Sequence, residues 1–160
     1  MSELAVLGGQ PVIPSPTKEL GPYTGDPWRF RDLEDAFRRH TGAKYAVRAA
    51  SGTAALISGL GAVGIGPGDE VITVAHTWVA SAAAILRNNG IPIFVDIDPQ
   101  TYTMDASKIE AAITPRTRAI LPVDLHGHPA PMFEIMEIPR GTACTLLRTP
   151  VSLEARRLMA

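Results

Sequence analysis

The chain has 160 residues, 46% of them hydrophobic, and a formal net charge of -1. This balance gives no support for a nucleic acid or an anionic membrane as a partner, and no apolar run approaches the roughly 20 residues that span a bilayer. A single cysteine, Cys144, excludes an intramolecular disulfide, and the start of the chain lacks the layout of a signal peptide. We therefore expect a cytoplasmic protein.

The first part of the chain is predicted to be an irregular arm followed by a helix. Residues 1–25 are rich in glycine and proline. The helix is expected to begin at Asp26-Pro27, because aspartate is a good N-cap and proline suits the first helical position. Gly42 supplies its end, and a short strand is predicted at 45–47.

From there helices and strands alternate. Helices are predicted at 53–63, 78–88, 105–113 and 132–138, and strands at 70–74, 91–95 and 118–123. This rhythm is typical of βαβ units, so we predict an α/β fold, a three-layer sandwich with a mainly parallel sheet. Functional residues of such sheets collect beyond the carboxyl ends of the strands.

Ser51-Gly52-Thr53 opens the predicted helix 53–63. The first amides of a helix have no intrahelical acceptor and carry the positive end of the helix dipole. Hydroxyls from serine or threonine and a glycine that allows close backbone approach make this turn a candidate phosphate seat. The alternative is an ordinary N-cap.

Trp78 closely follows the predicted strand 70–74, at the same edge of the sheet as Ser51-Gly52-Thr53. A flat indole there can stack on an aromatic ring of a ligand. The alternative is an ordinary core tryptophan.

Two further patterns are interpreted as structural. Residues 59–64 match G-x-G-x-x-G, but they close a predicted helix instead of opening one, so we interpret them as a helix end. His126-Gly127-His128 lacks a third ligand at a sensible spacing, so we interpret it as a polar loop and predict no metal site.

Taken together, seven segments resemble the DegT/StrS-type pyridoxal-phosphate-dependent sugar aminotransferases, a branch of fold type I. The matching segments are 42–47, 51–56, 66–72, 76–81, 95–102, 113–120 and 122–129. The likeness covers roughly residues 4–138, and the arm at 4–11 looks most like members that act on keto-cyclitols in aminoglycoside pathways.

The resemblance implies pyridoxal 5′-phosphate as cofactor, with Gly52 and Thr53 at its phosphate, Ser51 adjacent and Trp78 stacked on its pyridine ring. It implies that residues 26–138 are part of the large domain of a fold type I transferase. Intact relatives are expected to be homodimers that transfer an amino group from an amino acid to a keto sugar or keto-cyclitol.

The resemblance also implies a lysine that forms the Schiff base with the cofactor and an aspartate that keeps the pyridine nitrogen protonated. The lysines are Lys18, Lys44 and Lys108, and none occupies the family's lysine position, which would come well beyond residue 160. The aspartate would follow soon after residue 138 and is not there. We therefore expect a truncated aminotransferase, inactive by itself, with no catalytic residue.

Residues 139–160 form an Arg-rich tail with no strand pattern and are predicted to lie outside the family domain. We hypothesise a reading-frame shift near residue 139. With the frame offset, the genetic code permits His-Gly-Leu over 142–144 and Val-Ile-Glu-Asp-Ala-Gly-Gln over 146–152, which is the family's motif. The nucleotide sequence would decide this.

Two alternatives stay open. The chain could be a non-catalytic module that binds pyridoxal phosphate or dimerises with a complete relative. Another fold type I branch, such as an aldolase or a lyase, fits Thr77-Trp78-Val79 less well.

Overall fold

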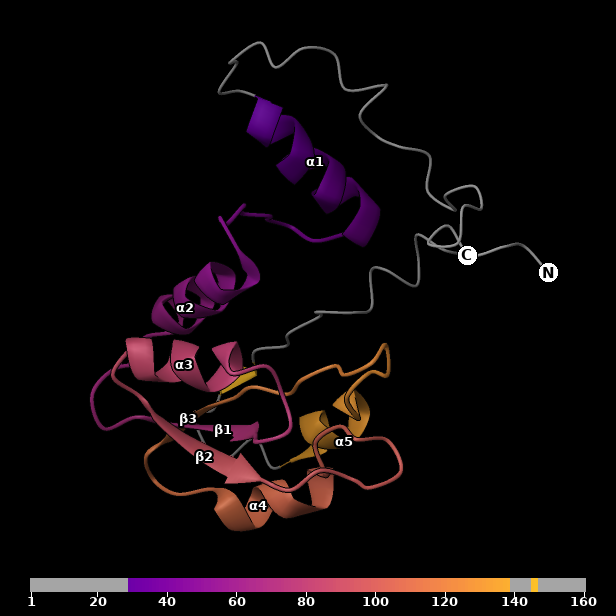
Figure 1. The fold of residues 1–160 in the computed structure, drawn as a ribbon. Helices are drawn as coiled ribbons and strands as arrows, with labels where there is room; N and C mark the ends of the chain where they lie inside the picture. Colours follow the sequence, from indigo (N-terminus) through magenta and orange to yellow (C-terminus); the bar gives the residue numbers. More distant parts are fainter. Residues whose placement is uncertain (1–28, 139–144, 147–160) are drawn as a thin grey trace, which may run out of the picture. The chain divides into compact units, whose positions relative to one another are not determined.

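The computed structural model describes residues 29–138 and 145–146, and the predictions for the arm and most of the tail lie outside these residues. The chain divides into two compact units, unit 1 (Met1–Arg48) and unit 2 (Ala49–Ala160). Figure 1 shows the elements of each unit. The candidate site lies in unit 2.

Unit 1 contains helix α1 (Arg29–Thr41). The helix ends as predicted at Gly42, whose φ of 73° is a conformation that glycine adopts without strain. The predicted strand at 45–47 is wrong, because this segment is irregular and its large side chains are uncovered: Tyr45 is 75% exposed and Val47 89%. A strand is stabilised by packing against its neighbours, which these side chains lack within unit 1.

Unit 2 is built on a parallel sheet with the strand order β2-β1-β3-β4. The strands are β1 (Glu70–Val74), β2 (Ile91–Val95), β3 (Thr117–Ile120) and β4 (Thr145–Leu146). Its helices are α2 (Gly52–Ala62), α3 (Ala80–Arg87), η3 (Ala106–Lys108), α4 (Ile109–Ala112) and α5 (Met132–Glu137). We call the end where β1, β2 and β3 start the amino edge and the end where they stop the carboxyl edge.

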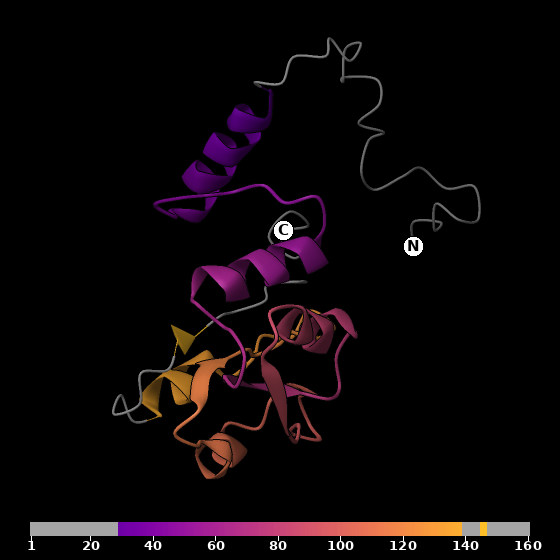
Figure 2. The ribbon, with the colours of Figure 1, turned by 90° about the vertical axis from the view of Figure 1, so that its left-hand side faces the viewer.

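The helices cover both faces of the sheet, which confirms the predicted α/β layering. Figure 2 shows α2 and α3 on one side of the strands and α4 on the other. Alternate residues of β1 point to opposite faces of the sheet. Val71 packs in the apolar cluster that contains Leu60 and Ile85, whereas Ile72 packs in the cluster that contains Ile109. The two apolar clusters therefore hold three layers together.

β1 and β2 have the predicted bounds, including a proline within β2. The N–H of Ile91 donates to the carbonyl of Asp69 (2.8 Å), toward β1. Successive residues of a strand turn their backbone groups to opposite sides, so Pro92 faces the outer side of this edge strand. A proline is tolerated there because no ladder hydrogen bond is lost.

β3 ends at Ile120, earlier than the predicted Val123. The N–H of Leu121 still donates to the carbonyl of Ile72 (2.7 Å), and the carbonyl of Leu121 accepts the Thr73 hydroxyl (2.9 Å), so a side-chain hydrogen bond joins the strands just beyond the end of β3. The tail has no strand pattern in its sequence, yet β4 lies in it and pairs with β3, Ala119 opposite Thr145. Two residues are too short for a period-two pattern, so sequence reasoning could not find this strand.

The amino edge carries a buried carboxylate with a full set of partners. Glu70 is buried, its Oε1 accepts from Nε of Arg116 (2.8 Å), and its Oε2 accepts from the Thr114 hydroxyl. The hydrogen bond from Thr114 makes the largest contribution and that from Arg116 the second largest. Together they hold the pKa of the Glu70 carboxyl below its usual value, although burial opposes the shift. The arrangement fixes the start of β1 to the segment before β3.

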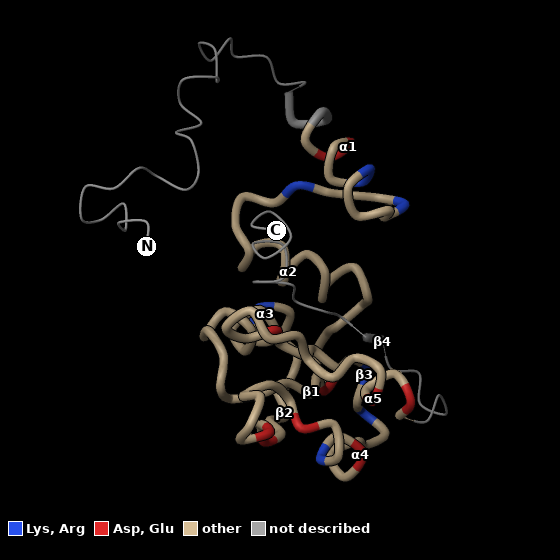
Figure 3. The backbone as a smooth tube through the Cα atoms, turned by 90° about the vertical axis from the view of Figure 1, so that its right-hand side faces the viewer, with Lys and Arg blue, Asp and Glu red and all other residues tan. Residues whose placement is uncertain are grey.

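Both acidic and basic positions occur along the described backbone, as Figure 3 shows. Among the described residues, no helix is both long and apolar enough to cross a membrane.

Candidate functional site

Ser51 is the N-cap of α2. Its backbone is extended, with φ of -160°, and its Oγ accepts the N–H of Ala54 at 3.1 Å. This satisfies one of the amides that a helix start leaves without a partner. The N-cap alternative is therefore correct for Ser51, and it is compatible with the phosphate seat because the same hydroxyl retains its proton to donate.

Gly52 and Thr53 form the first turn of α2 beside this cap. A Cβ added to Gly52 would meet nothing within 4 Å, and the φ of Gly52 is not one that requires glycine. Neither packing nor backbone conformation within unit 2 therefore demands a glycine at this position. Thr53 is half-buried. The space beside Gly52 is open, which lets an anion approach the first backbone amides of α2.

Trp78 lies in the segment between β1 and α3, and its side chain is 77% exposed. The interpretation as a core tryptophan is wrong. The backbone of Trp78 is fixed, since its carbonyl accepts the N–H of Ser81 (3.1 Å). The hydroxyls of Thr77 and Ser81, 3.0 Å apart, reinforce this turn. The indole is thus presented on a well-anchored segment with its faces open.

The start of α2 and Trp78 lie at the same end of unit 2. The side-chain amide of Asn88, just after α3, donates to the carbonyls of Ile57 (3.1 Å) and Ala84 (2.9 Å). This ties the later part of α2 to the end of α3, at the amino edge. Both helices therefore begin toward the carboxyl edge, as Figure 1 shows.

The two patterns that we interpreted as structural, residues 59–64 and His126-Gly127-His128, form a helix end and a loop. Residues 59–62 are the end of α2, and Gly64 has φ of 83° in the turn that follows, which confirms the interpretation as a helix end. His126 and Gly127 form a two-residue loop between Leu125 and His128, whose backbones exchange two hydrogen bonds. Among residues 29–138 and 145–146, no group of three metal-ligating side chains exists.

Three further residues lie at the carboxyl edge: His76, Tyr102 and Asp124. His76 and Asp124 follow predicted strands in the sequence, so strand alternation predicts that they lie at this edge, although it assigns them no role. Asp124 is buried, and its Oδ1 accepts the N–H of Ala130 (2.8 Å), which shapes the loop after β3. Tyr102 lies far enough beyond β2 that position along the chain gives no such signal.

Comparison with known proteins agrees with this arrangement. Residues 23–148 match the DegT/DnrJ/EryC1/StrS aminotransferase family. The chain belongs to this family. The match extends past residue 138, where the resemblance was predicted to end.

Relatives within the DegT/DnrJ/EryC1/StrS family are sugar and keto-cyclitol aminotransferases. The chain is 51% identical over 96 residues to the UDP-2-acetamido-2-deoxy-3-oxo-D-glucuronate aminotransferase of Pseudomonas aeruginosa, which covers 60% of the chain and 27% of that protein. It is 45% identical over 112 residues to the L-glutamine:2-deoxy-scyllo-inosose aminotransferase of Streptomyces lividus, which covers 70% of the chain and 26% of that protein. The chain thus spans about a quarter of the length of these relatives.

Solved structures of the family agree with the fold. NtdA from Bacillus subtilis with bound cofactor PMP has a TM-score of 0.73 and 39% identity, over 80% of this chain and 28% of that one. The 3-amino-5-hydroxybenzoic acid synthase also has a TM-score of 0.73, with 37% identity, over 76% of this chain and 32% of that one. The chain thus has part of the fold of the pyridoxal-phosphate-dependent aminotransferases, and the family uses pyridoxal phosphate as its cofactor.

Proposed function

We propose that the chain is the part of a sugar or cyclitol aminotransferase that seats the phosphate and one face of the ring of pyridoxal phosphate. The observation that carries this proposal is Trp78, which is 77% exposed on an anchored turn at the carboxyl edge of the sheet. Its neighbour Val79 is also exposed, so the two side chains together form an uncovered apolar surface, which marks a candidate binding site, and the flat indole face matches a pyridine ring.

The first turn of α2 fits the phosphate group of the cofactor. Ser51 and Thr53 offer hydroxyls, and Gly52 leaves open the space that a Cβ would fill. A dianionic phosphate is favoured at a helix start by the free amides and the helix dipole. In this proposal Ser51, Gly52 and Thr53 bind the phosphate, and Trp78 orients the ring and excludes water from one face.

Bound pyridoxal phosphate supplies an electron sink that allows an amino group to move between an amino acid and a keto compound. That chemistry also needs a lysine at the ring and a carboxylate at the ring nitrogen. Of the described lysines, Lys108 closes η3, and Lys44 lies in unit 1 with its Nζ 5.2 Å from the ring of Tyr45. Neither follows a strand end, so we propose that this chain by itself does not catalyse transamination.

We further propose that the substrate class is a keto sugar or keto-cyclitol, with an amino acid as amino donor, as the names of the relatives indicate. Homodimerisation belongs to the same proposal.

The proposal is tested by calorimetric titration of the chain with pyridoxamine 5′-phosphate, which has no aldehyde and so cannot label lysines at random. Trp78→Ala is expected to weaken binding by about 2- to 10-fold, since an aromatic pair contributes about 0.5–1.5 kcal/mol. The matched control is Val79→Ala, which truncates the exposed neighbour. Equal affinity of the wild type and Trp78→Ala would contradict the proposal.

The phosphate seat has its own matched pair of glycines within α2. A Cβ at Gly52 or at Gly59 meets no atom within 4 Å, so neither alanine disturbs the packing of unit 2. Gly52→Ala is expected to weaken binding, because the new methyl group occupies the approach to the amides, and Gly59→Ala to leave it unchanged.

The alternative function is a non-catalytic module that binds the cofactor or dimerises. To separate the two, this chain is added to a complete aminotransferase of the family and the turnover of that enzyme is measured. A gain or loss of turnover on addition favours the module. Turnover of a keto sugar by the purified chain alone would contradict the proposed inactivity.

A further inference from the structure

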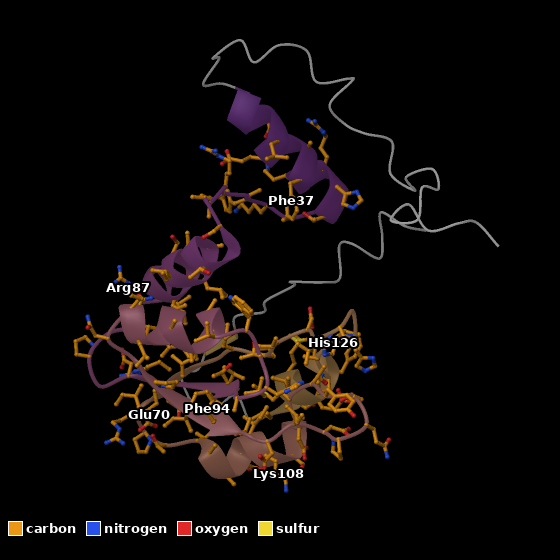
Figure 4. All side chains as sticks on the ribbon, viewed as in Figure 1. Phe37, Glu70, Arg87, Phe94, Lys108 and His126 are labelled. Carbon is orange, nitrogen blue, oxygen red and sulfur yellow. The ribbon has the colours of Figure 1, made fainter. Side chains whose placement is uncertain are left out.

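Three ring side chains from three different loops meet at the carboxyl edge. His76 follows β1, Tyr102 follows β2 and His126 follows β3. The ring centroids of His76 and Tyr102 are 6.0 Å apart and tilted, and those of His76 and His126 are 6.4 Å apart, edge to face. Figure 4 shows His126 at the end of the sheet opposite Glu70. All three side chains are exposed.

Two of the three residues adopt a backbone conformation that non-glycine residues avoid. Tyr102 has φ of 59° and His126 has φ of 50°. A left-handed conformation costs a residue with a side chain about 1–2 kcal/mol. Asn89 also has φ of 59°, but asparagine tolerates this conformation after a helix end. Histidine, like asparagine, is enriched in this conformation, so the strained residue is Tyr102, which lies within the cluster, as strain often does at binding sites.

Backbone hydrogen bonds hold the segments of Tyr102 and His126 in place. The N–H of Tyr102 donates to the carbonyl of Asp98 (2.8 Å), and the N–H of Asp98 donates to Thr103 (2.9 Å). The His126 loop is closed by the two hydrogen bonds between Leu125 and His128, at 3.0 and 2.7 Å. The backbone segments that carry Tyr102 and His126 are thus held in place before any ligand arrives.

The charges of the surrounding loops disfavour an anion. Residues 75–79, 96–104 and 121–131 contain no lysine or arginine but contain Asp96, Asp98 and Asp124. A neutral imidazole offers one donor and one acceptor, and a phenol hydroxyl offers both. This set suits hydroxyl groups, which also donate and accept, and the ring of Tyr102 adds an apolar face.

We infer that His76, Tyr102 and His126 form a subsite that binds the hydroxyl-bearing ring of a neutral sugar or cyclitol. Its role as part of the substrate site rests on the proposed function, which puts the cofactor ring at Trp78. His76 precedes Trp78 by two residues, so their Cα atoms lie within about 7 Å of each other. The subsite thus adjoins the face on which the cofactor ring stacks.

The inference is tested by NMR of the histidine side chains in the full chain, titrated with scyllo-inositol as probe. The ring signals of His76 and His126 are expected to shift with a shared, saturable dependence, while the exposed His40 in unit 1 does not shift. Cyclohexanol, a ring of the same size with one hydroxyl, is expected to shift neither. Equal shifts at His40, or none at the cluster, would overturn the inference. Inorganic phosphate that shifted the ring signals of His76 and His126 at lower concentrations than scyllo-inositol would overturn the assignment to a neutral ligand.

Variants separate the side chains from the backbone. His126→Asn keeps a residue that tolerates the left-handed conformation and removes the imidazole, and Tyr102→Phe removes one hydroxyl. Each is expected to weaken scyllo-inositol binding several-fold, whereas His40→Asn leaves it unchanged. Binding of scyllo-inositol without binding of pyridoxamine phosphate would contradict the proposed function and leave the subsite standing, and the reverse result would contradict the subsite alone.

Discussion

The amino and carboxyl edges of the sheet in unit 2 are built in opposite ways. At the amino edge Glu70 is buried with Thr114 and Arg116 as partners, and Gly90 is enclosed by apolar side chains. At the carboxyl edge Trp78 is exposed, and Gly52 faces open space. The carboxylate of Glu70 at the amino edge is buried with its partners, whereas the rings of Trp78 and Tyr102 at the carboxyl edge are exposed.

This contrast shows where the chain gains stability and where it keeps binding capacity. Burial and satisfied hydrogen bonds stabilise a fold. Exposed aromatic rings and left-handed residues such as Tyr102 do not, and they persist where a ligand uses them. Substitutions at the amino edge should therefore change the free energy of unfolding, and substitutions at the carboxyl edge should change ligand affinity.

The largest effect on stability is expected for Gly90→Ala. The new Cβ would lie 2.8 Å from Cγ2 of Ile65 and 3.1 Å from Cγ2 of Ile85. Such overpacking costs about 1–3 kcal/mol, to be measured by urea unfolding. Gly52→Ala is the matched control at the carboxyl edge and should unfold at the wild-type urea concentration or slightly above it. Equal destabilisation by Gly90→Ala and Gly52→Ala would contradict the proposed difference between the amino and carboxyl edges.

Ser51→Ala is expected to destabilise the chain by about 1 kcal/mol, because α2 loses the N-cap hydrogen bond to Ala54. Ser58→Ala, at an exposed position of the same helix, is the control. Because Ser51 belongs to both the cap and the proposed phosphate seat, it should also lower the affinity for pyridoxamine phosphate. Ser51→Asp separates the roles, since aspartate caps a helix but repels a phosphate.

Acid is expected to weaken the amino edge through Glu70. Its folded-state pKa is lowered from 4.5, so the stabilisation is present above about pH 4.5 and is lost as the pH falls through the folded-state value. Glu70→Gln should therefore lose less stability than the wild type between about pH 5 and pH 3. Glu110→Gln, at an exposed position of α4, should retain the wild-type dependence. Glu70→Gln should keep some loss of stability in acid. Asp105, whose pKa is lowered by the hydrogen bond from Ser107, accounts for part of that remaining pH dependence.

The smallest effect on stability is expected for Trp78→Ala. Surface substitutions usually change the free energy of unfolding by no more than about 0.5 kcal/mol, and this side chain is exposed. The same variant should give the clearest loss of cofactor affinity. A large drop in stability would mean that the indole packs against the protein in solution, contrary to the structure.

Much of unit 2 could be predicted from the sequence. β1 and β2 are short runs rich in β-branched apolar residues and bounded by turn residues, and their predicted bounds hold. The N-cap at Ser51 and the helix end before Gly64 follow from local chemistry that does not depend on the rest of the fold. The roles of Ser51, Gly52, Thr53 and Trp78 remain predictions.

What the sequence did not reveal depends on neighbours distant in the chain. Residues 45–47 have the composition of a strand, but whether they form one depends on a pairing partner. β4 exists because β3 offers an edge to two residues that carry no pattern of their own. Strand alternation predicts that His76 and His126 lie at one edge, but their meeting with each other and with Tyr102 depends on the order of three strands in the sheet, which no local pattern encodes.

Pro92, on the outer side of β2, has a consequence for self-association. Ile91 and Phe94 of the same strand are partly exposed, and an apolar edge strand can recruit a strand from another molecule and so start fibril growth. We expect Pro92→Val to shorten the lag before fibrils form, as measured by thioflavin T fluorescence, because it restores an outward N–H. By withholding one donor, the native proline makes this strand a poor template for polymerisation.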